Sequence, residues 1–376
     1  MKLIIALIFC AFFYYAQLFI YRKFWNKSFF VDINFAKTVV REGDHNQLIE
    51  VITNDKILPL PMVQIKFAIT KSFIFKSYDN SAITDQYYRN DYYSIMPYRR
   101  ITRTYDFTSS KRGYYRMKGM DVICKDLFLS GMCIKSYKHE AAVCVLPARV
   151  LLEEFTIKAR ELFGEIVDRY NRNEDPFEYA GIREYRSYDP MNRINWKASA
   201  KVSQLRVNKF NTTFTQRVVI AINMECHIKW HEEDFAEEQI RLAATFADYF
   251  IQSHIPVALY SNGCDILTGK LVEVEAGADI SHLRNIEIAL ARIKDNTGAG
   301  SFINIIDESL KNKTYDRTDY IIISNYRKND LVELYKKIKS ENIGVTWIIP
   351  EYGVVTPQIT KQGDSGIIKW TVKNAN

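Results

Sequence analysis

An apolar stretch near the N-terminus constrains this 376-residue chain more than any other feature. Between Leu3 and Tyr21 there is no charged side chain, and Gln17 is the only strongly polar one. As a helix that rises about 1.5 Å per residue, this stretch spans roughly 30 Å, the thickness of the hydrocarbon core of a bilayer. The sequence therefore predicts a transmembrane helix that contacts the lipid bilayer through residues 3–21.

Residues that favour the membrane–water interface occupy the second half of this stretch and the positions just after it. They are the aromatic residues Tyr14, Tyr15, Tyr21, Phe24 and Trp25 and the basic residues Arg22, Lys23 and Lys27. Basic residues beside a transmembrane helix favour the cytoplasmic side. We therefore expect a single-pass protein of the cell membrane, with the bulk of the chain in the cytoplasm.

A cleaved signal peptide is the main alternative for this segment. No small-x-small cleavage site closes it, because Ala16 is followed by bulky or polar residues, and the apolar run is longer than is usual for a signal peptide. A lipid-modified Cys10 is also disfavoured, since the bulky Phe9 precedes it. The six cysteines contain no C-x-x-C pair, so neither a zinc pattern nor a disulfide framework is expected.

The next part of the chain reads as strands. Residues 31–148 contain six or seven short alternating segments rich in Val, Ile, Tyr, Phe and Thr, separated by turn residues such as Gly43-Asp44 and Asn54-Asp55. This pattern is typical of a small β-sandwich. We therefore assign residues 1–27 to the anchor and its basic flank and residues 28–148 to a β-sandwich-like domain.

Helical periodicity begins after Pro147. Residues 150–170 have apolar positions at helical spacing, and residues 216–376 alternate between buried strands and helices. The predicted strands are 218–222, 255–260, 320–324 and 344–349, and the predicted helices are 234–253, 279–294, 301–311 and 331–340. Such alternation implies βαβ units and a mostly parallel sheet. The predicted fold class is thus α+β multidomain: a transmembrane helix, a small β-sandwich, a helix plus basic segment (149–215), and an α/β domain (216–376).

The basic segment, residues 181–210, carries a net charge of about +5, and the first thirty residues carry +4 of the total +7. The rest of the chain is therefore slightly acidic, and we expect no nucleic-acid binding despite a basic balance overall. The basic segment contains no nucleophile beside a base. Its residue types favour a binding or structural role over catalysis.

A short helix is predicted within the basic segment. Asp189 followed by Pro190 is a favourable N-cap and first-position pair, so a helix should run from about Pro190 to Lys201. Ile194 and Trp196 can then pack inward, and Arg183 can pair with Asp189. The candidate binding or structural residues are Arg183, Tyr185, Arg186, Asp189, Arg193, Asn195, Trp196, Lys197 and Arg206. A charge network that fastens the segment, a docking face for an acidic partner or phosphate, and a catalytic role all remain open.

The basic segment and several shorter motifs also carry a family resemblance. The segment contains Arg183-Glu184-Tyr185, Asp189, Arg193-Ile194 and Trp196-Lys197-Ala198-Ser199-Ala200, and the strand-rich region contains Arg41-Glu42-Gly43, Asn54 with Leu58-Pro59, Lys111-Arg112-Gly113-Tyr114-Tyr115, Asp126-Leu127-Phe128 and Leu146-Pro147. With these motifs the chain resembles the domain of unknown function 58 family over nearly its whole length. It departs from that family at Ser187-Tyr188, where Pro-Gly is usual, and in having one hydrophobic helix where relatives often have two.

The resemblance implies a C-terminal domain similar to von Willebrand factor type A domains and a MoxR-type AAA+ ATPase as a protein partner. Metal-binding type A domains end their first strand in D-x-S-x-S, whose oxygens hold a hard cation. Here Asn223, Glu225 and His227 occupy degenerate metal-site positions, and neither serine is present. We therefore expect no metal and no cofactor, and a non-enzymatic interaction or assembly protein.

A metal-dependent enzyme is the alternative function. Glu225 and His227, with His231, Glu232, Glu233 and Asp234, follow the first predicted strand of the α/β domain, and the two histidines are four residues apart. However, no H-E-x-x-H motif is present. A nucleotide-binding role is also disfavoured, because the chain has neither a phosphate-binding G-x-x-x-x-G-K-[ST] loop nor a dinucleotide fingerprint.

Overall fold

The computed structural model divides the chain into two compact units, Met1–Ala148 and Arg149–Asn376. It describes residues 2–75, 81–83, 86–138, 140–151, 157–172, 174–186, 189–212, 216–226, 232–298, 301–311, 317–341, 343–351 and 366–372. The boundary between the units lies just after the apolar strand that ends at Leu146. Each unit has its own hydrophobic core, so each is described by itself.

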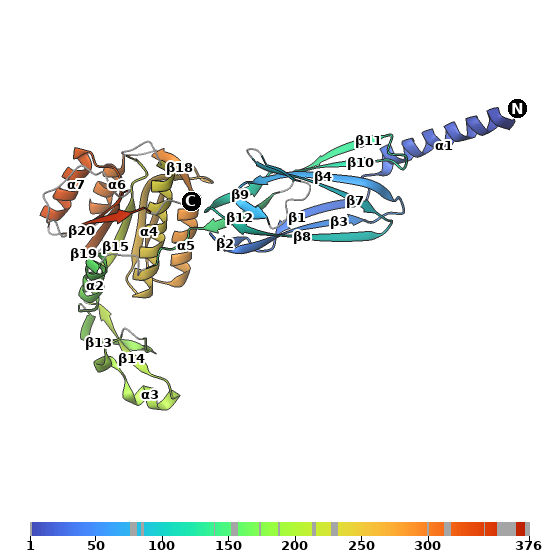
Figure 1. The fold of residues 1–376 in the computed structure, drawn as a ribbon. Helices are drawn as coiled ribbons and strands as arrows, with labels where there is room; N and C mark the ends of the chain where they lie inside the picture. The colour runs from blue at the N-terminus through green and yellow to red at the C-terminus, as the bar shows by residue number, and fades with distance from the viewer. Residues whose placement is uncertain are drawn as a thin grey trace. The chain divides into compact units, whose positions relative to one another are not determined.

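The first unit is a helix followed by a β-sandwich (Figure 1). Its elements are α1 (Lys2–Phe24), β1 (Phe29–Phe35), β2 (Val39–Arg41), β3 (His45–Asn54), β4 (Leu60–Thr70), β5 (Phe73–Phe75), β6 (Ser81–Ile83), β7 (Gln86–Ile95), β8 (Arg99–Ser109), β9 (Gly113–Met117), β10 (Met120–Lys125), β11 (Met132–Tyr137) and β12 (Ala141–Leu146). One sheet has the order β1-β3-β8-β5, the facing sheet has the order β11-β10-β4-β7-β6, and β2, β12 and β9 form a third.

The sandwich core forms because its strands alternate apolar and polar residues. Every second side chain is buried in β3 and, from Val63 onward, in β4, and Leu48, Ile52 and Ile65 have no exposed surface. Side chains of period two lie on one face of a strand, so the two main sheets bury their apolar faces against each other. Phe73 and Phe107 complete this core with ring centroids 4.5 Å apart.

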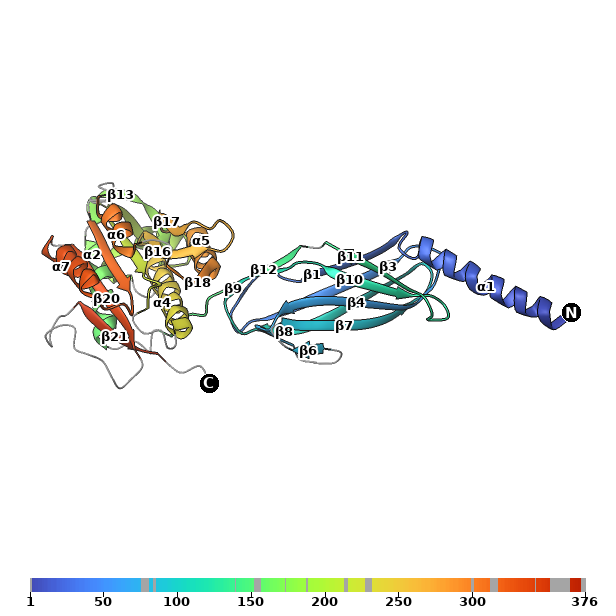
Figure 2. The same cartoon turned by 90° about the horizontal axis from the view of Figure 1, so that it is seen from above.

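Helix α1 leaves one end of the sandwich (Figure 2). It is the one helix among the described residues that is long and apolar enough to cross a membrane. Its first half is exposed, as Leu3 at 78% and Phe12 at 70% show, whereas Tyr21 and the following Trp25 are buried in the sandwich core. The helix is therefore free of the sandwich at its start and attached to it at its end.

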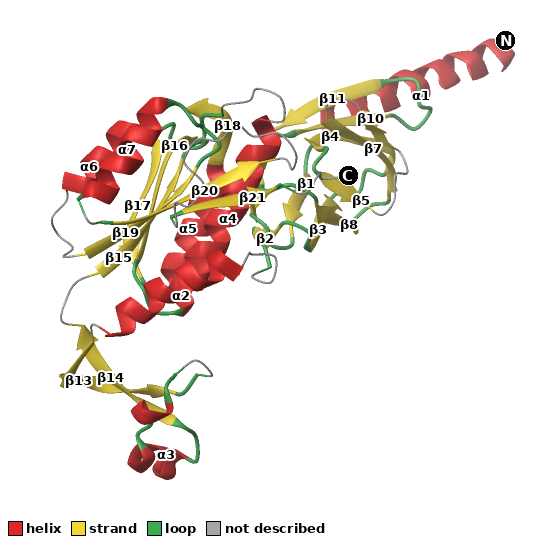
Figure 3. Cartoon of the chain, turned by 60° about the vertical axis from the view of Figure 1, so that its left-hand side comes forward, coloured by secondary structure: helices red, strands yellow, loops and turns green. Residues whose placement is uncertain are grey.

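The second unit is built on a mixed sheet with helices on both faces (Figure 3). The sheet has the order β17-β16-β15-β19-β20-β21, and β18 also pairs with β16. Its strands are β15 (Gln216–Ile222), β16 (Val257–Asp265), β17 (Leu271–Gly277), β18 (Ile293–Gly298), β19 (Arg317–Ile323), β20 (Gly344–Glu351) and β21 (Ile367–Thr371), and its helices are α2 (Ile157–Arg172), α4 (Glu232–Gln252), α5 (Ile280–Arg292), α6 (Phe302–Lys311) and α7 (Asn329–Ser340).

Strand β15 shows why helices cover both faces of this sheet. All seven of its residues are buried. Val218 and Ile220 pack with α2, α4 and α5 in one core, whereas the intervening Val219 and Ala221 pack with α6 and α7 in another. A strand buried on both faces reads as a continuous apolar run, and the last five residues of β15, Val218–Ile222, form such a run.

A separate small element completes the second unit. Strands β13 (Glu174–Glu184) and β14 (Arg206–Thr212) pair antiparallel as a two-stranded sheet of their own, and the 3₁₀ turn Met191–Arg193 and helix α3 (Trp196–Val202) lie between them in sequence. We call residues 174–212 the arm. It contains the whole described part of the basic segment.

The predicted fold class is wrong for this chain. Of the sixteen strand pairings between the described strands, eleven are antiparallel and five are parallel. Antiparallel sheets make up the first unit and the arm almost entirely, and β17 and β18 add antiparallel strands to the sheet of the second unit. The von Willebrand factor type A-like assignment came from the family resemblance, and the mostly parallel sheet came from the strand–helix alternation of the last 160 residues. That alternation is a local pattern and does not show how the strands pair.

Candidate functional site

The arm is the first candidate site, and Asp189 organises its turn. Arg183 donates two hydrogen bonds to the Asp189 carboxylate, each 2.6 Å long, and the backbone amide of Arg186 donates a third at 2.8 Å. Asp189 is only 7% exposed. Two parallel bonds from one guanidinium fix both position and orientation. The pairing of Arg183 with Asp189 that the sequence analysis considered is therefore present.

The charge of Asp189 is stabilised by these donors. Burial by itself would raise the pKa of the Asp189 carboxyl, but the hydrogen bonds from Arg183 and from the Arg186 amide hold that pKa below its usual range. The carboxylate is thus ionised at neutral pH and already engaged. Arg186 also donates from its guanidinium to the carbonyl oxygen of Gln252, at the end of α4, at 3.1 Å.

The predicted helix from Pro190 to Lys201 is wrong in its start and in its cap. Because the Asp189 carboxylate is occupied by Arg183, the amides after Pro190 are not capped by it, and a 3₁₀ turn forms instead. Helix α3 begins at Trp196, and the Asn195 side-chain oxygen caps it by accepting from the amide of Ala198 at 2.9 Å. Asn195 also donates to the side-chain oxygen of Asn208 on β14 at 2.7 Å, which ties the helix to the strand.

The arm has a very small apolar interior. Ile194 is 6% exposed and forms an isolated bridge with Val207, which is fully buried. Ser199 reinforces this contact, since its hydroxyl donates to the carbonyl of Asn195 and accepts from the amide of Arg206, both at 2.8 Å. Ile194 therefore packs inward as predicted. Side-chain hydrogen bonds provide much of the stability that a larger apolar core provides in other elements.

Trp196 does not pack inward, contrary to the prediction. It is 65% exposed at the first position of α3. Other exposed apolar side chains of the arm are Ile182 (46%), Met191 (71%), Val202 (52%) and Leu205 (44%). The sequence analysis missed this set because an apolar residue beside a short helix is expected to be buried when the core that receives it is not visible in the sequence.

The basic residues of the arm divide into two groups. Arg183 is used internally, and Arg206 lies 3.3 Å from the Glu184 carboxylate. Lys197 and Lys201 are exposed on α3, and neither forms an ion pair within the described ranges. Arg193 and Tyr185 are half-buried, and the amide of Tyr185 donates to the carbonyl of Leu205 at 3.0 Å. The arm thus presents exposed lysines beside exposed apolar side chains.

The end of strand β15 is the second candidate site, where a metal would sit if the alternative function held. Asn223, 1% exposed, accepts from the side-chain amide of Asn262 at 2.9 Å and from the backbone amide of Glu225 at 3.0 Å. Asn262 in turn accepts from the amide of Met224 at 2.7 Å. His227 and His231 lie outside the described residues.

Next to it, Asn325 donates to the carbonyl of Pro350 at 2.6 Å, and its own oxygen lies 3.5 Å from the sulfur of Cys226. The strand ends are therefore joined by neutral amide side chains that satisfy one another. No group of three potential metal-ligating side chains occurs in the portion of the chain that the structure describes. The residues present there do not fit a hard cation, which requires several anionic oxygens.

A buried polar cluster lies inside the sandwich. Tyr93 and Tyr105 both donate to the Glu50 carboxylate, the latter at 3.0 Å, and Arg89 pairs with Asp91 at 2.8 Å. Glu50 has no exposed surface, and its burial raises the pKa of its carboxyl despite the hydrogen bonds from the two tyrosines. A carboxyl sealed between two sheets has no access to substrate, so this cluster is structural.

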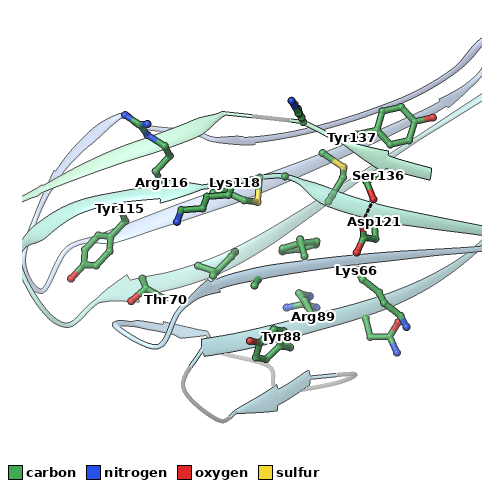
Figure 4. A pocket seen from close by; sticks show the side chains of 18 of the residues that line it. Lys66, Thr70, Tyr88, Arg89, Tyr115, Arg116, Lys118, Asp121, Ser136 and Tyr137 are labelled. Carbon is green, nitrogen blue, oxygen red and sulfur yellow. Dashed lines mark hydrogen bonds between the residues drawn. The ribbon is translucent and has the colours of Figure 1, made fainter. Parts of the chain in front are cut away.

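The sandwich also carries an open groove of about 1080 Å³ (Figure 4). Residues of seven strands and of the turn between β9 and β10 line it. Its basic and aromatic side chains include Lys66, Arg116, Lys118, Tyr88, Tyr115 and Tyr137. Asp121 accepts a hydrogen bond from Ser136 at 2.5 Å on its wall. The groove was not predicted from the sequence, because the lining residues come from strands far apart in the sequence.

Comparisons with known proteins were made for the whole chain. No protein-family model matches it, and no curated protein matches it. Similar solved structures include the CARDB domain of a Pyrococcus furiosus protein, which is 15% identical, with 32% of this chain and 90% of that chain covered and a TM-score of 0.22. A non-cellulosomal cohesin from Archaeoglobus fulgidus is 10% identical, with 31% and 91% covered and a TM-score of 0.22.

The ASH/PapD-like domain of human CEP192 is a third similar structure. It is 11% identical, with 31% of this chain and 87% of that chain covered and a TM-score of 0.19.

Proposed function

We propose that this protein is a membrane-anchored, non-enzymatic interaction protein that binds a protein partner through the arm. The exposed Trp196, held on a small and heavily hydrogen-bonded element beside exposed lysines, is the observation that carries the proposal. Helix α1 would attach the protein to the bilayer. The basic residues in its last turn and just after it favour a cytoplasmic position for the bulk of the chain.

The chemistry of the arm suits a protein partner with an acidic surface. Tryptophan is among the residues that contribute most to protein–protein binding, because its large rigid ring buries much area at little entropic cost. Lys197 and Lys201 would meet acidic side chains at the rim and increase the rate of association. The network around Asp189 and Asn195 holds these residues in place before binding, which reduces the cost of ordering them.

A MoxR-type AAA+ ATPase is the partner that we propose. This choice rests on the resemblance of the arm and of the strand-rich region to the domain of unknown function 58 family. It does not depend on the fold of the second unit. The described side chains at the end of β15 give no support to the alternative of a metal-dependent enzyme, because the neutral amide side chains of Asn223, Asn262 and Asn325 are gathered there and are hydrogen-bonded.

Binding of the full chain to the purified ATPase from the same organism tests the proposal. The full chain in detergent micelles would be titrated with the ATPase, with and without nucleotide, and the Kd measured. The test variant is Trp196→Ser with Lys197→Glu. The matched control is Ile280→Ser with Lys270→Glu, which makes the same changes at exposed positions of the same unit, with Ile280 81% exposed.

We expect the arm variant to raise the Kd about tenfold or more, equivalent to at least ~1.4 kcal/mol, and the control to leave it unchanged. An equal loss in both variants would show that general charge and apolarity, not the arm, govern binding. Failure of the wild-type chain to bind in either nucleotide state would remove the ATPase as partner. Circular dichroism of each variant would confirm that its fold is intact.

A further inference from the structure

The turn between β10 and β11 lies against the second half of α1. We call residues 126–131 the hairpin tip. Gln17 of α1 donates from its side-chain amide to the Asp126 carboxylate at 2.7 Å, and Tyr14 donates to the hydroxyl of Ser130 at 3.0 Å. The rings of Tyr14 and Phe128 have centroids 6.1 Å apart. The hairpin tip therefore lies alongside the second half of α1.

The outer face of the hairpin tip is apolar and exposed. Leu127, Phe128 and Leu129 are consecutive and are 51%, 53% and 52% exposed. Three bulky apolar residues in succession are unusual at the end of a hairpin, where small and polar residues are favoured. Exposed apolar surface of this kind marks a site of interaction.

The one charged group of the hairpin tip is turned to its interior. Asp126 is 3% exposed and accepts from the backbone amides of Ser130 and Gly131 at 2.7 and 2.9 Å, in addition to the bond from Gln17. The Ser130 hydroxyl donates a further bond at 2.8 Å. The carboxylate thereby satisfies part of the tip's own backbone, as an apolar environment requires.

The length of α1 decides where the hairpin tip lies in a membrane. From Leu3 to Phe13, before the first contact with the tip, the helix has eleven residues and a length of only about 17 Å. A hydrocarbon core is about 30 Å thick, so a crossing also needs the turns from Tyr14 to Tyr21. Those turns are the ones that the tip accompanies.

We propose that the hairpin tip enters the bilayer beside α1 and that Leu127, Phe128 and Leu129 contact lipid acyl chains. The proposal rests on the membrane anchoring by α1 that is part of the proposed function. Arg22 and Lys23 in the last turn of α1 and Lys125 at the base of the tip then lie at the level of the anionic headgroups. The bilayer thus holds the sandwich by two elements, which limits rotation about α1.

Tryptophan quenching by lipids with brominated acyl chains tests this placement. The full chain would be reconstituted into vesicles of phosphatidylcholine and phosphatidylglycerol. The quenching of each variant would be compared with that of the wild type, so that the contribution of the native tryptophans can be subtracted. Phe128→Trp and Leu127→Trp report on the hairpin tip, and Phe12→Trp reports on the exposed half of α1. Ile74→Trp is the matched control, because Ile74 is 50% exposed and pairs with Thr108 of β8. Thr108 is nine residues from Arg99, the first residue of β8, so the two lie about 30 Å apart along the strand.

We expect the added tryptophan of either tip variant to be quenched to about the same extent as that of Phe12→Trp, and that of Ile74→Trp not to be quenched. If Phe12→Trp were quenched and neither tip variant were, the inference would be overturned and the membrane anchor would stand. The same result would be seen if a second copy of the chain covered the hairpin tip. No quenching of any variant would overturn both. Quenching of all four would show general adhesion of the sandwich, which also contradicts a specific role of the tip.

Discussion

The hairpin tip and the arm both present exposed apolar side chains on a turn held by an aspartate, but different groups donate hydrogen bonds to the two aspartates. Each exposes bulky apolar side chains on a short turn that has almost no core of its own. In each, a nearly buried aspartate holds the turn: Asp126 is 3% exposed and Asp189 is 7% exposed. A carboxylate has enough lone pairs to satisfy several donors at once, so one residue can organise a whole turn.

The donors are what differ. Asp126 accepts hydrogen bonds from neutral groups, namely an amide side chain, a hydroxyl and two backbone amides, whereas Asp189 accepts from the guanidinium of Arg183. Lysines accompany the exposed Trp196 but are absent from the hairpin tip. Exposed apolar surface surrounded by neutral groups suits lipid, and the same surface among cations suits an acidic protein in water. The comparison therefore assigns different occupants to two superficially similar turns.

The largest effect is expected from removing the carboxylate of the hairpin tip. Asp126→Ala leaves the Gln17 side chain and the amides of Ser130 and Gly131 without their acceptor. Each hydrogen bond to a charged group contributes about 1.5–3 kcal/mol, and part of the loss is recovered by water. We expect the free energy of unfolding to fall by about 3 kcal/mol, measured by urea denaturation of the full chain in detergent micelles.

Asp121→Ala is the matched control for this change. Asp121 lies on the same hairpin, on β10, and accepts one bond from Ser136 in an exposed setting. Its removal should cost no more than about 0.5 kcal/mol. If both substitutions cost the same, Asp126 does not organise the hairpin tip, and the parallel with Asp189 fails.

A smaller and local effect is expected in the arm. Asp189→Asn keeps an accepting oxygen but loses the charge that pairs with Arg183, so the turn should open more often. We expect about tenfold faster hydrogen exchange of the Arg186 amide, which corresponds to ~1.4 kcal/mol of lost local stability. Asp307→Asn, which removes the partner of Lys337 elsewhere in the unit, should leave exchange in the arm unchanged.

The same site should respond to acid. The pKa of Asp189 is lowered in the folded chain, so its contribution to stability is fully present above the unfolded-state pKa of about 3.9 and is lost as the pH falls through the lower folded value. At that low pH the wild-type arm should exchange as fast as that of Asp189→Asn, after correction for intrinsic exchange. A persistent difference between them would mean that the charge of Asp189 is not what holds the turn.

Local patterns predicted the local structure well and failed where distant residues decide. The strands and helices of residues 216–349 lie close to their predicted ranges, because continuous apolar runs and helical periodicity are local signals. Strands β17 and β21 were missed, since a short strand at a sheet edge has little burial to mark it. The fold class was wrong because strand–helix alternation does not show whether neighbouring strands pair parallel or antiparallel, and β17 and β18 both pair antiparallel with β16.

The candidate sites show the same difference between contacts that local sequence predicts and contacts that depend on distant residues. The pairing of Arg183 with Asp189 was foreseen from residues six positions apart. The cap of α3 is Asn195 and not Asp189, because the helix begins at Trp196, seven residues after Asp189. The contact between Gln17 and Asp126 joins residues 109 positions apart, and no pattern near either residue in the sequence predicts it.

The smallest effect is expected at the closest approach between the hairpin tip and α1. A Cβ atom on Gly131 would lie 2.7 Å from the Cδ2 atom of Leu18, so Gly131→Ala must displace that methyl group. Because the end of a leucine side chain can move, we expect a loss of only about 1 kcal/mol in the free energy of unfolding, by the same urea denaturation. Leu18→Ala removes the obstructing atoms, so the double variant Gly131→Ala with Leu18→Ala should show no added penalty from the alanine at 131. A full penalty in the double variant would mean that the tip is not packed on α1, and the neutral network of Asp126 would then have to be explained within the hairpin alone.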